Sequence, residues 1–170
     1  MTSAAAARDG DAASDALVER LRPLLAAAHR LAYGMLQGSH EAEDAVQEAI
    51  FKAWRARDRV RPDADLRPWF LKIVANECRQ RLRRRWWSVV KRDEVPAPAT
   101  PDPTPAWDDA ADLGEALRSL PYEQRLVLVL RYYLDLPLEE VARALGISPG
   151  AARARVHRAL DKLRMEVPER

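Results

Sequence analysis

The 170-residue sequence contains a single cysteine, Cys78, and only 6 glycines. One cysteine cannot form an internal disulfide, and it excludes a metal site made of several cysteines. Runs of β-branched residues are few, whereas Ala, Leu, Arg and Glu are abundant, and this balance favours an all-α protein. No apolar run reaches the ~18 residues of a membrane span, so we expect no membrane insertion.

The N-terminal segment also lacks the features of a secretory signal. Its alanines are interrupted by Asp9, Asp11 and Asp15, and no basic region, apolar region and cleavage site follow one another. Together with the single cysteine, this favours a cytoplasmic protein. Because residues 1–14 are small or polar, we expect them to be disordered.

The formal net charge of +2 conceals a strong segregation of charge along the chain. Residues 15–92 hold 17 Lys and Arg against 10 Asp and Glu, residues 93–112 hold none against 6, and residues 113–170 hold 10 against 8. Two basic blocks separated by an acidic connector are typical of a protein whose two surfaces face a polyanion. We therefore expect two small helical domains, at residues 15–87 and 113–170.

Residues 88–112 form the connector between these domains. Five of the 12 prolines lie here, which indicates a semi-extended linker. A fully flexible chain of this length spans only ~25–30 Å on average, whereas polyproline geometry at ~3.1 Å per residue reaches ~75 Å. The composition therefore suits a linker that bridges distant elements better than one that folds back.

The first domain begins with an apolar helical pattern from Asp15 to Gln37, which we expect to bend near Pro23 and to end at Gly38. A second helix of about five turns follows, with Ser39 as its N-cap and acidic residues in its first turns. Its apolar stripe, which we expect to face the core, consists of Val46, Ala49, Ile50, Ala53 and Trp54. Its opposite face consists of Asp44, Gln47, Glu48, Phe51 and Arg55. An exposed aromatic ring among polar groups is typical of a docking surface, and a solvated face with one stray aromatic is the alternative.

A third helix is predicted from Leu66 to Trp87, with Asp65 as N-cap and Pro68 in the first turn. Its apolar stripe consists of Leu66, Trp69, Phe70, Ile73 and Val74. Seven positive charges then fall within residues 79–92, and two tryptophans stand among them. This exceeds what the dipole of a helix C-terminus needs, so the pattern favours phosphate contact over a merely solvated face.

The second domain is predicted to contain four helices, of which the last two form a helix-turn-helix. Pro137 opens the third helix, Gly146 ends it, and Ser148 and Pro149 begin the fourth. This order of helix, short Gly-containing turn and basic helix is typical of DNA-binding modules, against the alternative of a small structural bundle. The candidate contacts off the core stripe are Ser148, Arg153, Arg155, His157 and Arg158.

Within the second helix, the run Glu-Asp-Ala-Val-Gln-Glu-Ala-Ile-Phe-Lys-Ala-Trp resembles region two of bacterial RNA polymerase sigma factors, in the extracytoplasmic-function (ECF) group. The resemblance implies that this helix docks on the clamp helices of the polymerase beta-prime subunit. The implied docking residues are Asp44, Gln47, Glu48 and Phe51. Phe51 departs from the frequent pattern of the family, in which another residue stands at that position.

The run Trp-Phe-Leu-Lys-Ile-Val-Ala-Asn-Glu resembles the part of the same domain that holds the minus-ten promoter element as it melts. The chemistry is suitable, because aromatic faces stack on unpaired bases while cationic side chains follow the backbone. By resemblance, the loop from Arg57 to Asp65 forms the pocket for an extruded base. The implied minus-ten contacts are Arg57, Arg59, Arg61, Trp69, Lys72, Asn76, Arg79 and Arg83, with core packing as the alternative for Trp69.

The second domain carries Leu-Pro-Tyr-Glu-Gln-Arg, Leu-Glu-Glu-Val-Ala, Leu-Gly-Ile-Ser-Pro-Gly and Arg-Val-His-Arg-Ala, which look like sigma region four. The resemblance implies that this domain recognises the minus-thirty-five element and sits on the polymerase beta flap. Ala151 and Ala152 replace the frequent Thr-Val pair, so a hydroxyl contact to DNA is lost at that point.

The two resemblances together imply an alternative sigma factor. Such a protein is a dissociable subunit without catalytic activity that directs core RNA polymerase to promoter DNA and assists its melting, and an anti-sigma factor often holds it inactive. A standalone helix-turn-helix regulator is the alternative, but it leaves the polar face of the second helix without a role. An enzyme is disfavoured because the histidines His29, His40 and His157 are scattered and no Gly-rich phosphate loop exists. No cofactor or metal is expected.

Overall fold

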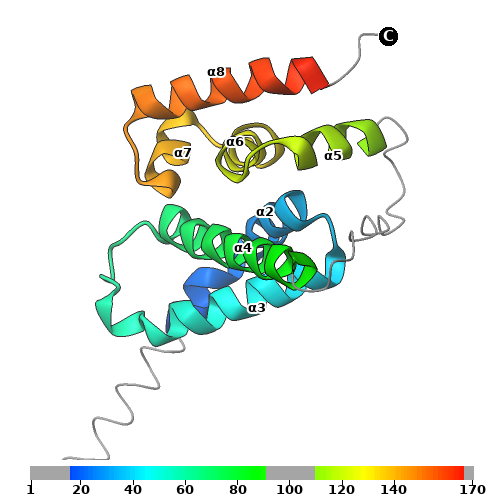
Figure 1. Cartoon of the computed structure of the whole chain (residues 1–170). Coiled ribbons are helices and arrows are strands. Elements are labelled where there is room, and N and C mark those ends of the chain that lie inside the picture. The colour runs from blue at the N-terminus through cyan, green and yellow to red at the C-terminus, as the bar shows by residue number, and fades with distance from the viewer. Residues whose placement is uncertain (1–15, 91–109, 167–170) are drawn as a thin grey trace, which may run out of the picture.

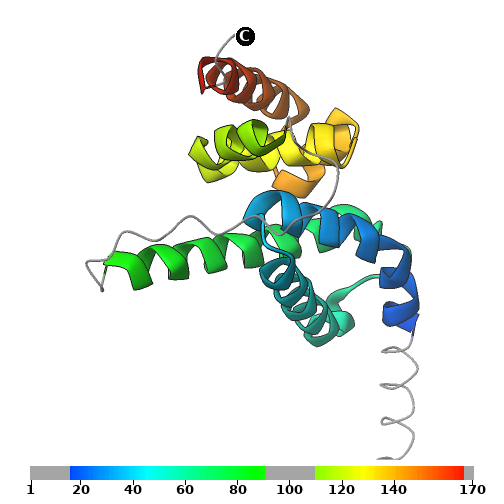
Figure 2. The same cartoon turned by 90° about the vertical axis from the view of Figure 1, so that its right-hand side faces the viewer.

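The computed structural model describes residues 16–90 and 110–166, which form helices and turns and contain no strand (Figures 1 and 2). The all-α class predicted from the sequence is confirmed. Residues 16–21 are helical, and the later elements are η1 (Arg22–Leu24), α2 (Leu25–Leu36), α3 (Ser39–Arg55), η2 (Arg57–Arg59), α4 (Leu66–Val90), α5 (Ala110–Ser119), α6 (Tyr122–Leu128), the π-helical η3 (Val129–Tyr133), α7 (Leu138–Leu145) and α8 (Pro149–Glu166). The predictions for residues 1–14 and for 91–109 of the linker lie outside the described residues.

The first helical pattern is interrupted at Pro23, as predicted, by the short 3-10 turn η1. The predicted end at Gly38 is wrong by one residue, because Gln37 takes the left-handed conformation with a φ of 57°. Its side chain compensates, since it donates to the carbonyl of Gly114 at 2.9 Å and accepts from Arg118 at 2.6 Å. Gly38 is the extended N-cap of α3, so Ser39 is already helical and makes no cap bond of the kind predicted.

Helix α3 faces the core with most of the predicted stripe, since Val46, Ala49 and Ala53 are buried and Ile50 packs partly buried against the hydrophobic cluster. Its buried residues are Ala42, Ala45, Val46, Ala49 and Ala53. The alanines let α2 and α4 pack closely against it. The prediction that Trp54 belongs to the core is wrong, because its side chain is 40% exposed and stacks on Phe51, with the ring centroids 6.2 Å apart.

Helix α4 is the longest described element and passes the predicted end at Trp87 to reach Val90. The carboxylate of Asp65 accepts from the backbone amide of Arg67 at 3.2 Å, which confirms the predicted N-cap. The core-facing side of α4 carries the buried residues Leu66, Phe70, Leu71, Val74 and Cys78. The C-terminal half of α4 extends beyond the other helices, as Figure 2 shows in green.

Helices α5 to α8 form the second part of the molecule. Gly146 ends α7 with a φ of 67°, a conformation that glycine adopts without strain, and the hydroxyl of Ser148 accepts from the amide of Ala151 at 3.2 Å at the start of α8. Both predictions about this turn are confirmed. Helix α8 packs on α6 and α7, so the helix-turn-helix has its expected form.

The two parts, residues 16–90 and residues 110–166, pack directly on each other. Figure 1 shows α4 lying beneath α6 and α7, and their buried side chains belong to one hydrophobic cluster. The two parts approach each other closely at Gly34 of α2, because a Cβ there would lie 2.9 Å from a methyl carbon of Val129. A glycine inside a helix costs about 1 kcal/mol relative to alanine. Its place here is therefore explained by the close contact with η3.

Arg125 joins the two parts from inside. Its buried guanidinium donates to the carbonyl of Met35 in α2 at 2.9 Å, and to those of Leu117 and Arg118 at 2.8 and 2.7 Å. Burial, with a smaller contribution from the charge of Arg118, lowers the pKa of this group. The carbonyls at the end of α5 thereby gain donors that the helix itself cannot provide.

Candidate functional surfaces

The outward face of α3 is exposed at the residues predicted to dock a partner. Gln47 and Glu48 lie in solvent, and Phe51 is 51% exposed. Asp44 forms an ion pair with Arg81 of α4, 3.5 Å apart. Phe51 and Trp54 stack on each other, so the face presents an aromatic pair with polar groups on one side. Trp54 was assigned to the core from the sequence, because the helical period alone does not reveal that alanines fill the core side.

The loop after α3 presents the predicted cationic residues next to this aromatic pair. The guanidinium of Arg57 lies over the Trp54 ring, 4.5 Å from its centroid, and donates to the Trp54 carbonyl at 3.2 Å. Arg59 and Arg61 are exposed, and Arg61 pairs with Asp63 at 3.1 Å. The loop is thus a cationic surface attached to the end of α3.

Four of the predicted minus-ten residues form a line along α4, here called the α4 stripe: Lys72, Asn76, Arg79 and Arg83. They recur at intervals of three or four residues, so they lie on one face of the helix, and all four are exposed. Trp69 is only partly buried and packs against the hydrophobic cluster. Its position agrees with the core-packing alternative for that residue.

The beginning and the middle of the α4 stripe face the second part of the molecule. The Lys72 ammonium lies beside Gly146, 3.3 Å from where a Cβ would stand. The Arg79 guanidinium lies over the ring of Tyr122, 4.7 Å from its centroid, and pairs with the carboxylate of Glu123. The sequence gives no sign of these contacts, because the partners are more than forty residues apart.

Two further ion pairs join α4 and the residue before it to α7. Arg67 lies 3.3 Å from Glu140, and Asp65 lies 2.9 Å from Arg143. These groups are partly or largely exposed, so each pair contributes little to stability on its own. The pairs identify the face of α7 that lies against α4.

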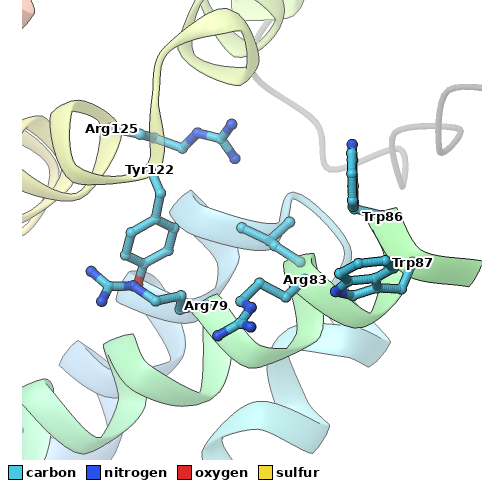
Figure 3. A pocket seen from close by; sticks show the side chains of 7 residues that line it. Arg79, Arg83, Trp86, Trp87, Tyr122 and Arg125 are labelled. Atoms are coloured by element: carbon cyan, nitrogen blue, oxygen red, sulfur yellow. The ribbon is translucent and has the colours of Figure 1, made fainter. Parts of the chain in front are cut away.

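The far end of the α4 stripe is open. A groove of about 450 Å³ lies between α4 and α6 and is lined by Arg79, Leu82, Arg83, Trp86, Trp87, Tyr122 and Arg125 (Figure 3). Trp86 and Trp87 are 61% and 54% exposed and meet edge to face, with their centroids 5.2 Å apart. Neither was named as a contact from the sequence, although their position within the basic run of the third predicted helix was a usable signal.

Helix α8 presents Arg153, His157 and Arg158 to solvent, as predicted for a recognition helix. Arg155 differs, because it is half-buried and pairs with the second carboxylate oxygen of Glu123 at 3.1 Å. One glutamate therefore holds an arginine of α4 and an arginine of α8 at the same time.

Comparison with known proteins matches both parts of this architecture. Residues 17–88 match the family description Sigma-70 region 2, and residues 110–163 match Sigma-70, region 4. The RNA polymerase sigma factor SigV of Bacillus subtilis is 32% identical over 139 residues, which are 82% of this chain and 83% of that protein. The chain belongs to the RNA polymerase sigma factors.

Two other similarities refine the assignment of this sigma factor. The ECF RNA polymerase sigma factor SigM of Mycobacterium tuberculosis is 34% identical over 135 residues, which are 79% of this chain and 68% of that protein. The sigma factor RpoE of Bartonella quintana, solved in complex with the anti-sigma factor NepR, superposes with a TM-score of 0.73 at 27% identity over 88% of this chain and 95% of that one. The predicted ECF group is confirmed.

This sigma factor is accordingly a transcription initiation factor and not an enzyme. The alternative of a standalone helix-turn-helix regulator is wrong, because region two accompanies region four. Within residues 16–90 and 110–166, no helix is long and apolar enough to cross a membrane. In the same described residues, no three His, Cys, Asp or Glu side chains gather as metal ligands would.

Proposed function

We propose that this sigma factor divides its tasks among three helices: α3 binds core polymerase, α4 holds the melted minus-ten strand, and α8 recognises the minus-thirty-five element. The observation that carries the proposal is the outward face of α3. Gln47, Glu48 and Phe51 are exposed there and do not contribute to the core. A folded domain has no structural need for an exposed aromatic pair, whereas a docking surface does.

The proposed polymerase contact is the face formed by Asp44, Gln47, Glu48 and Phe51. In this arrangement the aromatic ring supplies the apolar centre, and the polar groups form a rim that fixes orientation. By family resemblance the partner surface is the pair of clamp helices on the beta-prime subunit. The stacking of Phe51 on Trp54 extends the apolar centre toward the cationic loop.

The proposed minus-ten contacts are the cationic loop and the α4 stripe. Arg57, Arg59 and Arg61 would meet backbone phosphates, and the partly exposed Trp54 ring lies beside them under the Arg57 guanidinium. Extruding a base costs a few kcal/mol, so a surface already built from stacked rings and fixed cations lowers what melting requires. Asn76 can donate to or accept from a base edge.

The proposed minus-thirty-five contacts lie on α8, which would enter the major groove as recognition helices do. Arg153 and Arg158 are exposed on it and can reach guanine edges or phosphates. The amides at the start of α8, next to Ser148, suit a phosphate. By family resemblance this domain also contacts the polymerase beta flap.

A protein anti-sigma factor is the proposed regulator. RpoE of Bartonella quintana, which shares this fold over most of its length, was solved with the anti-sigma factor NepR. We expect the sigma factor to meet both this regulator and the polymerase in the cytoplasm.

Replacing Asp44, Gln47 and Glu48 together by alanine tests the docking face. Substitutions of exposed residues usually change the free energy of unfolding by less than about 0.5 kcal/mol, so the melting temperature should stay nearly unchanged. Co-purification with core polymerase should fall sharply. The matched control is Glu19→Ala with Asp63→Ala, which also removes two exposed carboxylates from the first part of the chain. If the triple variant binds polymerase as well as the control does, the assignment of α3 is wrong.

A further inference from the structure

Two adjacent residues at the start of α6 lie on the α4 stripe. The ring of Tyr122 packs beside the Arg79 guanidinium, and its hydroxyl donates to the carbonyl of Ala75 at 2.5 Å. The carboxylate of Glu123 pairs with the same Arg79. Figure 3 shows Tyr122 reaching from α6 to the surface of α4, next to Arg79. A neutral aromatic ring and a negative charge are thus presented together to one arginine.

This pair has the chemistry of a nucleotide. Single strands bind proteins through bases that stack on aromatic or guanidinium planes and through phosphates that pair with cations. The Tyr122 ring stands in for the base, and the Glu123 carboxylate stands in for the phosphate. Both occupy the α4 stripe at Arg79, in the middle of the proposed minus-ten surface.

Glu123 also reaches the second DNA-binding surface. Its other carboxylate oxygen pairs with Arg155 of α8 at 3.1 Å, which leaves Arg155 half-buried. Arg79 and Arg155 therefore share one acidic side chain as an ion-pair partner, although each was predicted to face a different promoter element.

The contact is supported by a packed interface around it. Gly34 admits the side chain of Val129 at a distance that no larger residue allows, and Arg125 donates across the same interface to the carbonyl of Met35. Burial raises the pKa of the Tyr122 hydroxyl, which stays a neutral donor. Tyr122 and Glu123 are thus held on α4 by the packing of the two parts of the chain.

We propose that Tyr122 and Glu123 are an intramolecular nucleotide mimic that masks the minus-ten surface and one recognition-helix arginine in the free sigma factor. The inference rests on the proposed role of α4. A single strand reaches the open groove at Arg83, Trp86 and Trp87 first, and it occupies the rest of the α4 stripe only after it displaces Tyr122 and Glu123. Because only the unmasked fraction of molecules is competent, the mimic weakens the apparent affinity by that fraction.

The test measures binding of the full chain to a fluorescently labelled oligothymidylate of about 15 nucleotides, since stacking and phosphate contacts tolerate any sequence. Glu123→Gln keeps the shape and removes the charge, and Glu139→Gln is its control, because it removes one exposed carboxylate from α7. Tyr122→Leu keeps an apolar contact and removes the ring, and the exposed Tyr132→Leu is its control. Glu123→Gln removes two partly exposed ion pairs. Because such pairs are weak, we expect its affinity for the strand to exceed that of its control by roughly threefold to tenfold.

Two results distinguish failure of the nucleotide mimic from failure of the proposed minus-ten role of α4. If Glu123→Gln and Tyr122→Leu both bind the strand no better than their controls, while Arg83→Ala binds it less well than wild type, the mimic is refuted and the role of α4 stands. If the strand binds equally well after Arg79→Ala and Arg83→Ala, the minus-ten assignment of α4 fails, and the mimic fails with it. Melting curves show whether each variant is folded. If either Glu123→Gln or Tyr122→Leu melts at a lower temperature than wild type, the conclusion is drawn from the other of these two variants.

Discussion

Glu77 and Arg125 are the buried charged residues among those that the structure describes, and each has partners that replace water. The Glu77 carboxylate accepts from the Lys52 ammonium at 2.5 Å, between α3 and α4. Arg125 donates to backbone carbonyls of α2 and of the C-terminal end of α5. Removing one partner of a buried charge leaves the other uncompensated, which typically costs several kcal/mol. These two residues therefore belong to the scaffold, although their sequence context alone resembles that of solvated charges.

Cys78 is expected to be chemically inert in the folded protein. Burial raises the pKa of its thiol from 9.0 to about 12, so almost no thiolate forms near neutral pH. At pH 8 a disulfide reagent should label Cys78 only after urea unfolds the chain, and the reaction should follow the unfolding curve. Rapid labelling of the folded protein would show that the site around Cys78 opens locally.

The same thiol makes stability depend on alkaline pH. Because the pKa is higher in the folded state, the contribution of the thiol is fully present below pH 9.0 and is lost as the pH rises toward about 12. Over that window the free energy of unfolding should fall by up to about 1.4 kcal/mol per pH unit more than it does in Cys78→Ala. If the free energy of unfolding depends on pH equally in wild type and Cys78→Ala, the pKa of this thiol is not raised by folding.

At the scale of the helices, the sequence predicted several boundaries because local chemistry sets them. Pro23 interrupts the first helix, Asp65 and Ser148 cap α4 and α8, and Gly146 ends α7. These signals need no knowledge of distant residues. Where prediction failed, a tertiary contact decided: Trp54 lies outside because alanines bring α2 and α4 close to α3.

Helix α8 gives a prediction about promoter recognition. Arg158→Ala should cost about 1–3 kcal/mol and relax specificity at one base if Arg158 contacts a base edge, or weaken all sequences alike if it contacts a phosphate. The measurement is run-off transcription by the reconstituted holoenzyme on promoters that vary within the minus-thirty-five element. Lys162→Ala on the same helix is the control. Unchanged transcription from every promoter after Arg158→Ala would exclude α8 contact at that residue.

At the scale of the whole molecule, the packing of residues 16–90 on residues 110–166 could not be predicted from the sequence. The ion pairs that join them connect positions far apart in the chain, such as Asp65 with Arg143. Composition suggested instead a connector suited to bridging distant elements. The sequence identifies Arg79 and Arg155 as basic residues that could contact DNA. It does not predict that Glu123 pairs with both of them.

Gly34→Ala should loosen this packing without changing any charge. The added Cβ would lie 2.9 Å from Val129 and 3.3 Å from Tyr133, and such overpacking costs typically 1–3 kcal/mol, of which helix propensity returns about 1. Spin labels on cysteines introduced at His40 and Asp161 should report a longer or broader distance distribution. Gly150→Ala is the control, because nothing lies within 4 Å of that Cβ. An unchanged distribution in Gly34→Ala would mean that the interface adapts to the methyl group.

We expect this sigma factor to open promoters only together with core polymerase. Free protein should bind duplex promoter DNA weakly and with strong salt dependence, because its minus-ten surface requires unpaired bases and polymerase must hold both domains at the right spacing. The most direct measurement is permanganate footprinting with and without core enzyme, alongside a gel shift. We predict reactive thymines in the minus-ten element only when both proteins are present. Tight, specific duplex binding by the free protein, with no polymerase-dependent melting, would contradict the account.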